Sequence, residues 1–260
     1  MRRSLLICLL AVAALAAQKG VLLEDLTWVE AEKALKPDTV VVIPIGAESK
    51  EHGPHLKLRN DFVMAEYFKK RLLERADVVV APTVNYHYYP AFLQYPGSTS
   101  LRMETARDVL VDICHTLAAY GPKRFYALNT GVSTMGPLKL SAEMLAKDGI
   151  LFRYTNILEV GADAEKKIKQ EEGGTHADEI ETSLMLYIDP GSVEMSKAVK
   201  DFHPHGKGGL TRDPNTPGTY SASGIYGDAT LATREKGEIM ANAMLAGMLR
   251  EIDELRAAKP

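Results

Sequence analysis

The chain has 260 residues, a formal net charge of -3 and a hydrophobic content of 46%, which is sufficient for a substantial core. This length favours one large domain over two small ones. With 31 basic and 34 acidic residues, the composition gives no basic surface for nucleic acid. A small molecule or a peptide is therefore the expected partner.

The first 17 residues have the pattern of a secretory signal peptide. Two arginines precede an apolar stretch at residues 5–15, and small residues follow it. This stretch is shorter than the roughly 20 residues that a permanent membrane anchor needs, although an uncleaved anchor is the alternative. We therefore expect cleavage, export to the periplasm or the medium, no stable membrane anchor, and a single mature domain of residues 18–260. After cleavage Cys114 is the one cysteine left, which excludes an internal disulfide.

Three apolar runs without alternation predict strands that are covered on both faces. They are Thr39–Ile45, Asp77–Ala81 and Arg124–Leu128. Between them, the helical spacing of apolar residues over Phe62–Arg75 and Met103–Tyr120 predicts two helices. Strands that alternate with helices indicate an α/β fold with a mostly parallel sheet, and such sheets carry their sites at the carboxyl ends of the strands.

The second half of the chain continues the same alternation. Residues 150–160 predict another strand, and residues 177–187 predict a helix with Thr175 as its cap. Residues 229–258 are typical of a long amphipathic closing helix. Residues 203–224, rich in Gly, Pro, Thr and Ser, show no period, and a loop of this length is usually functional or mobile.

The segment 46–61 leaves the first predicted strand at its carboxyl end. It contains two histidines and three carboxylates: Glu48, Glu51, His52, His55 and Asp61. Imidazole and carboxylate are the ligands of hydrolytic Zn²⁺, Mn²⁺ and Fe²⁺ centres, so the segment predicts a divalent-metal site. A solvated polar loop is the alternative. Asn60 or Asp61 is also the expected N-cap of the helix that follows.

Five collinear motifs over nearly the whole mature region resemble the creatininase family of metal-dependent amidohydrolases. They are Ile43–Gly46, His52–Leu56 with Asp61, Pro96–Leu101, His176–Ser183, and Gly224–Thr233 followed by Glu235–Gly237. The resemblance implies three layers, α/β/α, around a mainly parallel sheet. It also implies a pair of divalent metals in the loops and a homo-oligomer, often a hexamer.

By position in these motifs, the resemblance implies roles for four side chains. His52 matches a metal ligand, and Asp61 matches the carboxylate that bridges two metals. His176 matches the histidine that contacts the substrate and assists the chemistry. Glu181 matches an acid that orients His176 or a ligand, as the partners of metal ligands commonly do.

Two positions depart from the family pattern. Lys50 stands where a glutamate ligates metal, and Gly131 stands where a histidine does. A catalytic zinc usually keeps three protein ligands, so a further donor is needed. The candidates are Glu51, Glu48, His55 and the acids of residues 176–181. An ammonium cannot ligate while protonated, and Lys50 could instead neutralise a carboxylate in a site without metal.

We therefore expect a hydrolase of amide or cyclic-amide C–N bonds. In this interpretation the metal activates water, and His176 with Glu181 assists the transfer of a proton to the leaving nitrogen. His55, Ser133 and Glu179 are assigned to substrate binding. The alternative is a homologue with an impaired metal site that binds a small molecule on the same scaffold. The fold does not specify the substrate.

Overall fold

The computed structural model describes residues 18–204 and 206–259, and its centre is a five-stranded sheet with the strand order β1-β3-β2-β4-β5. All four strand pairings in this sheet are parallel, so the predicted mainly parallel sheet is confirmed. The strands are β1 (Val21–Leu22), β2 (Val40–Ile45), β3 (Val79–Val80), β4 (Arg124–Asn129) and β5 (Leu151–Tyr154).

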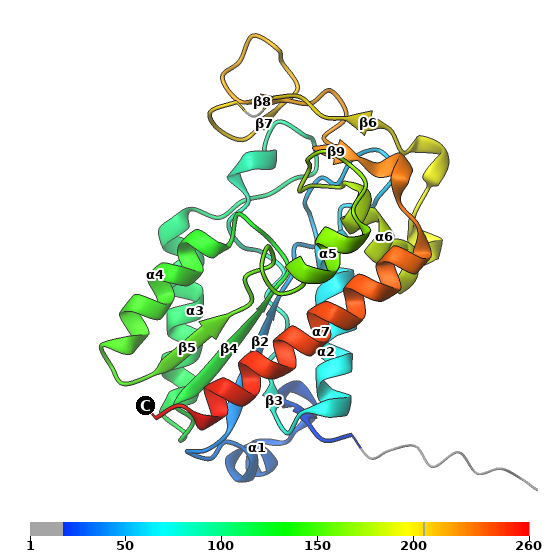
Figure 1. Cartoon of the computed structure of the whole chain (residues 1–260). Coiled ribbons are helices and arrows are strands. Elements are labelled where there is room, and N and C mark those ends of the chain that lie inside the picture. Colours follow the sequence, from blue (N-terminus) through cyan, green and yellow to red (C-terminus); the bar gives the residue numbers. More distant parts are fainter. Residues whose placement is uncertain (1–17, 205, 260) are drawn as a thin grey trace, which may run out of the picture.

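Helices cover both faces of the sheet and complete three layers, as Figure 1 shows. One face carries α2 (Asn60–Arg75), α6 (Glu179–Ile188) and the closing helix α7 (Arg234–Ala257), together with the short α5 (Ala162–Ile168). The other face carries α3 (Met103–Ala118) and α4 (Met135–Ala146), together with the short α1 (Trp28–Ala34). The predicted three-layer α/β/α fold is confirmed.

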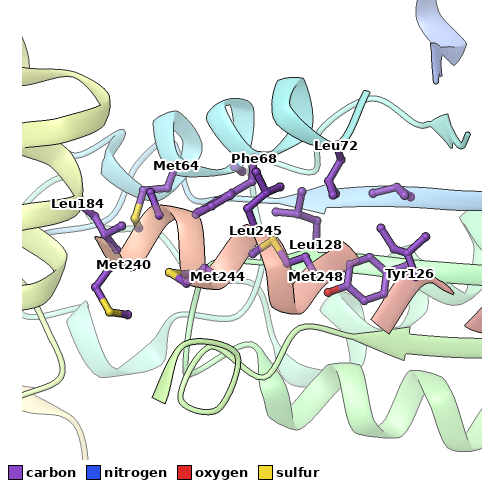
Figure 2. Close-up of a cluster of buried hydrophobic side chains, with 14 of the residues drawn as sticks. Met64, Phe68, Leu72, Tyr126, Leu128, Leu184, Met240, Met244, Leu245 and Met248 are labelled. Carbon is purple, nitrogen blue, oxygen red and sulfur yellow. The ribbon is translucent and has the colours of Figure 1, made fainter. Parts of the chain in front are cut away.

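The buried strand β2 separates two hydrophobic cores. Val40 and Val42 belong to the core beneath α2 and α7, whereas Val41 and Ile43 belong to the core beneath α3 and α4. Both faces of the strand are therefore apolar, which explains its run without alternation. Figure 2 shows the first core, where side chains of α2, α6 and α7 meet those of β4: Met64, Phe68, Leu72, Leu184, Met240, Met244, Leu245, Met248, Tyr126 and Leu128.

The caps of two helices differ from the predictions. Helix α2 begins at Asn60 with Arg59 as its N-cap, so the expectation that Asn60 or Asp61 caps it is wrong. Both side chains are instead directed toward the candidate site described below. Helix α6 is capped by Asp178 rather than by Thr175, because the Asp178 carboxylate accepts two backbone N–H groups of the first turn.

The boundaries of other elements also differ from the predicted ones. The strand expected over residues 150–160 ends at Tyr154, and the closing helix begins at Arg234, since Thr233 accepts a capping bond from the backbone of the first turn. The segment without period contains the paired strands β7 (Leu210–Thr211) and β8 (Thr219–Tyr220). Beside it, β6 (Lys200–Asp201) pairs with β9 (Gly227–Asp228).

A close approach of backbone segments builds the floor of the site. A Cβ atom on Gly46 would lie 2.5 Å from the carbonyl oxygen of Asp61 and 2.8 Å from the Cβ of Ala65. Glycine therefore allows the first turn of α2 to lie directly against the end of β2. The Thr130 hydroxyl donates to the carbonyl of Ile45 at 3.0 Å, which adds the loop after β4 to the same place.

The structure describes Cys114 but not the predicted signal peptide. Cys114 is a fully buried free thiol in α3. Within residues 18–204 and 206–259, no helix has the length and apolar character needed to cross a bilayer. The signal peptide at residues 1–17 lies outside the described residues and stays a prediction.

Candidate active site

Charged and imidazole side chains from two segments converge at the carboxyl ends of β2 and β4. The first segment, from the loop after β2 to the start of α2, supplies four of them: Lys50, Glu51, His52 and Asp61. The second segment, at the start of α6, supplies His176 and Glu181. All except Glu181 are more than 90% buried. They lie beside a cavity of about 280 Å³ whose wall includes Lys50, His176 and Glu181.

The orientation of His52 leaves one ring nitrogen facing two carboxylates. Its Nδ1–H group donates to the backbone carbonyl of Lys50 at 2.9 Å. Its Nε2 therefore lies on the other side, 2.8 Å from Asp61 Oδ1 and 3.4 Å from Glu181 Oε1. Burial and the Lys50 ammonium oppose a charge on the ring, but the two carboxylates outweigh them and raise the pKa of His52 to about 9. This position thus favours a cation, either a proton or a metal ion.

Glu181 is held at both carboxylate oxygens. Its Oε1 accepts a hydrogen bond from Asn60 Nδ2 at 2.9 Å, and its Oε2 accepts one from the backbone N–H of Ala177 at 2.6 Å. Burial opposes its charge, but His52 and His176 hold the pKa of Glu181 well below its usual range. Ala177 has a φ of 49°, an uncommon left-handed conformation for a residue other than glycine. Such strain is typical of functional sites.

His176 is paired with the second acid of the first segment. Its Nε2 lies 3.1 Å from Glu51 Oε2, and its ring packs against Phe92 with centroids 4.4 Å apart. Its backbone pairs with Tyr226, whose N–H donates to the His176 carbonyl at 2.9 Å. The Glu51 carboxylate also accepts a short hydrogen bond from the backbone N–H of Gly53. His176 therefore has a fixed carboxylate partner on the side of one ring nitrogen.

Lys50 occupies the opposite side of Asp61. Its Nζ lies 2.7 Å from Asp61 Oδ2, and the ammonium lies 4.8 Å from the centroid of the Phe92 ring. Burial opposes the charge of Asp61, but Lys50 and His52 hold the pKa of this carboxyl below its usual range. One oxygen of Asp61 thus faces the imidazole and the other faces the ammonium.

The donors fit one divalent cation. His52, His176 and Glu181 each offer a ligand atom, and these atoms lie within 4.8 Å of one another. Asp61 Oδ1 lies beside the same His52 nitrogen. The oxygen of Asp61 that a second ion would use, Oδ2, instead faces the Lys50 ammonium. These side chains could hold a divalent cation, and Lys50 lies on the side of Asp61 away from them.

The two candidates for the missing ligand have different positions. Glu51 joins the cluster, where it pairs with His176. Glu48 is exposed and accepts a hydrogen bond from Asn85 Nδ2 at 2.8 Å, so the expectation that it supplies a ligand is corrected. The backbone N–H of Glu48 donates to the carbonyl of Asn85, which directs its side chain along the neighbouring segment.

The three residues assigned to substrate binding lie in different parts of the structure. Ser133 lies in the cavity wall. His55 is buried behind the cluster, with its Nε2 2.8 Å from the Thr182 hydroxyl. Glu179 is fully buried, pairs with Lys236 and accepts the backbone N–H groups of residues 170 and 171. Among the described residues, neither His55 nor Glu179 is part of the cavity wall, and their assignment to substrate binding stays a prediction.

Several contributors to the site were not predicted. Asn60 holds Glu181, and Phe92 packs on both His176 and Lys50. The cavity wall also contains apolar side chains of three helices: Met64, Ile180, Leu184, Met240 and Met244. In the sequence these apolar residues have the helical spacing of an ordinary core, so no local signal separates them from it.

Buried His87 gives the protein an acid-sensitive element. His87 is fully buried, and burial lowers its pKa to about 4. The unfolded chain, with a histidine pKa of about 6.5, binds more protons than the folded state below that pH. We therefore expect the contribution of His87 to the free energy of unfolding to be fully present above about pH 6.5. This contribution should be lost as the pH falls toward 4.

Replacing His87 by leucine should reduce this pH dependence, as measured by urea denaturation at a series of pH values. An unaltered slope in His87→Leu would show that His87 does not bind its proton on unfolding.

Comparisons with known proteins identify the family. A family model described as creatinine amidohydrolase matches residues 24–252. Creatinine amidohydrolase of Pseudomonas putida is 28% identical over 255 residues, covering 91% of this chain and 97% of that protein. A 3-dehydro-scyllo-inosose hydrolase of Thermotoga maritima is 26% identical, covering 87% and 80%. A mycofactocin precursor peptide peptidase of Mycolicibacterium smegmatis is 26% identical, covering 80% and 82%.

Solved structures agree with these relatives. A structure described as creatininase Mn superposes with a TM-score of 0.75 at 27% identity, covering 91% of this chain and 98% of that chain. A mutant creatininase of the Zn-Zn type superposes with a TM-score of 0.72 at 26% identity, covering 91% and 98%. The matched family model spans most of the chain and includes the whole cluster described above. The chain therefore belongs to the creatininase family of amidohydrolases.

Proposed function

We propose that this chain is a metal-dependent hydrolase that cleaves an amide or cyclic-amide C–N bond in a small molecule or a peptide. The observation that carries the proposal is that two carboxylates meet His52 Nε2, Asp61 Oδ1 at 2.8 Å and Glu181 Oε1 at 3.4 Å, with His176 beside them in the cavity wall. Hydrolytic metal centres use this combination of imidazole and carboxylate.

The proposed ligands are His52 Nε2, Asp61 Oδ1 and Glu181 Oε1. Their separations from the His52 nitrogen, 2.8 Å and 3.4 Å, are close to the roughly 3 to 3.5 Å between neighbouring ligands of one zinc ion. A divalent ion there would supply Lewis-acid activation of water. The backbone carbonyl of Lys50 fixes the ring of His52, and Asn60 fixes the carboxylate of Glu181, so the donors are oriented in advance.

His176 is the proposed proton carrier. It lies in the cavity wall, and Glu51 accepts at its Nε2 side at 3.1 Å. In this arrangement His176 takes a proton from the attacking water and delivers it to the leaving nitrogen, while Glu51 stabilises the imidazolium. The oxygen of water forms a bond to the carbonyl carbon, the C–N bond breaks, and the proton from water ends on the amine.

The cavity suits a small molecule or the end of a peptide. Its volume of about 280 Å³ is near the lower limit of ligand pockets, roughly 300 Å³. Part of its wall is apolar, with Met240 and Met244 from α7 and Leu184 from α6. We propose that an apolar part of the substrate lies against these side chains, away from the charged cluster.

A panel of small amides, lactams and short peptides tests the proposed activity. The purified protein should hydrolyse at least one class, lose the activity after chelation, and regain it with Zn²⁺, Mn²⁺ or Fe²⁺. Activity that is insensitive to chelation would contradict the metal-dependent mechanism. No turnover by the metal-loaded protein would contradict the hydrolase itself.

A second candidate function is a small-molecule binding protein on the same scaffold. The Lys50–Asp61 ion pair favours it, because Asp61 already has a cationic partner without metal. In that case compounds of the panel would raise the melting temperature without being cleaved. Turnover by the metal-loaded protein would reject this alternative.

We also propose that residues 1–17 are removed on export and that the mature chain forms a homo-oligomer. The apolar pattern of the N-terminus supports the first proposal, and the family resemblance supports the second. The intact mass of protein recovered from the periplasm or the medium tests the cleavage. Light scattering after size-exclusion chromatography tests the oligomer.

A further inference from the structure

Lys50 is a fixed cation in the wall of the catalytic cavity. Its side chain is 5% exposed, and its Nζ lies 2.7 Å from Asp61 Oδ2. Its backbone is held on both sides, since its N–H donates to Leu58 O at 3.0 Å and its carbonyl accepts from His52 Nδ1 at 2.9 Å. The centroids of the Phe92 and Tyr89 rings lie 4.8 Å and 5.6 Å from the ammonium. Lys50 is therefore positioned by the fold.

The charges of the cluster balance one divalent cation. Three carboxylates, those of Glu51, Asp61 and Glu181, face one ammonium, that of Lys50. With His52 neutral as a ligand and His176 neutral, these groups carry a net charge of minus two. One divalent cation neutralises this charge, whereas two would leave an excess of two positive charges in a buried site. Burial of an unbalanced charge is strongly unfavourable.

The threonine hydroxyls of the loop after β4 are engaged within the protein. Gly131 lies in the cavity wall without a side chain, and the Thr130 hydroxyl already donates to the carbonyls of Ile45 and Asp61. Thr134 donates to the Asn129 side chain. Lys50 therefore supplies the positive charge beside Asp61 Oδ2, where Gly131 provides no side chain.

We infer that the Lys50 ammonium takes the place of a second metal ion, so that each chain binds one divalent cation. This inference rests on the proposed metal-dependent function. His52, Asp61 Oδ1 and Glu181 would hold the ion, and Lys50 pairs with the other oxygen of Asp61. A protein-supplied charge there keeps Asp61 ionised and oriented in the absence of a second metal.

Metal content gives the test, independently of activity. The full chain is stripped with chelator, loaded with Mn²⁺, and analysed by native mass spectrometry and elemental analysis. The wild type should bind about one ion per chain, and Lys50→Glu should bind about two at saturating Mn²⁺, because the variant exchanges the ammonium for a ligand. Lys57→Glu is the matched control, since it makes the same charge change at an exposed position of the same loop and should stay at about one.

A double variant and electron paramagnetic resonance provide a second measure of the number of bound ions. Lys50→Glu with Gly131→His adds a second donor, and a Cβ at position 131 would meet Thr134 Oγ1 at 3.3 Å, a contact that a small side-chain shift relieves. This variant should bind the second ion at lower Mn²⁺ concentration than Lys50→Glu. Two Mn²⁺ ions that share Asp61 couple magnetically, so its electron paramagnetic resonance spectrum should lose the hyperfine pattern of isolated Mn²⁺ that the wild type shows.

The outcomes separate the inference from the proposed function. Two ions per chain in the wild type would overturn the inference and leave metal-dependent hydrolysis intact. No ion in the wild type would overturn both. One ion in a folded Lys50→Glu protein, verified by circular dichroism, would overturn the inference alone. If both variants fail to fold, the wild-type stoichiometry and spectrum still decide between one ion and two.

Discussion

Replacing Asp61 by leucine should lower the free energy of unfolding of the metal-free protein by about 3–5 kcal/mol. Asp61 is fully buried, and it is the acceptor 2.7 Å from the Lys50 ammonium. Without it, a buried ammonium loses its partner, and the cost of that charge exceeds the net contribution of the intact pair. Guanidinium denaturation in the presence of chelator measures the effect, because chelator removes any contribution from metal binding.

The double variant Lys50→Met with Asp61→Leu provides the decisive control. Replacing both members of a buried ion pair by apolar side chains is often nearly neutral, so the double variant should recover most of the stability that Asp61→Leu loses. Glu254→Ala breaks the exposed pair between Arg153 and Glu254 and should cost less than about 1 kcal/mol. A double variant as unstable as the single one would show that Lys50 is not destabilised by the loss of Asp61.

The central strands could be predicted because both their faces are buried. β2 and β4 contain continuous apolar runs, and the predicted and observed ranges differ by one residue at one end. Helix α4 was missed because Gly136-Pro137 near its start is typical of a loop. Proline is tolerated in the first turn of a helix, where its missing N–H has no intrahelical acceptor. Tertiary packing of Leu138 and Leu145 supports the helix despite this local signal.

The identity of the site residues was accessible from the sequence, but their pairing was not. His52, Asp61, His176 and Glu181 came from motif positions, and all four meet in the structure. The pairing of carboxylates with imidazoles depends on the left-handed turn at Ala177. This turn places Glu181 beside His52, and Glu51 pairs with His176. Such a turn at a residue other than glycine has no sequence signal.

His176→Ala should lower kcat by about 10²- to 10⁴-fold, which is the range for loss of a general acid–base. The expectation follows from the position of the ring: it lies in the cavity wall with Glu51 at its Nε2, and the proposed ion has three other protein ligands. Steady-state kinetics on the substrate found in the panel measure kcat and KM separately. KM should change little, because the ring acts on the proton transfer rather than on ground-state binding.

Three further readouts distinguish a proton carrier from a ligand or a structural residue. The metal content of His176→Ala should equal that of the wild type, since a lost ligand would lower it. Added imidazole should restore part of kcat, because the truncated side chain leaves room beside the cavity for a small base. Glu51→Gln should shift the pH profile of kcat while keeping most of the metal, since Glu51 touches His176 and not His52. If His176→Ala loses its metal, the ring is a ligand; if kcat is unchanged, the proton follows another route, and Glu181 becomes the candidate base.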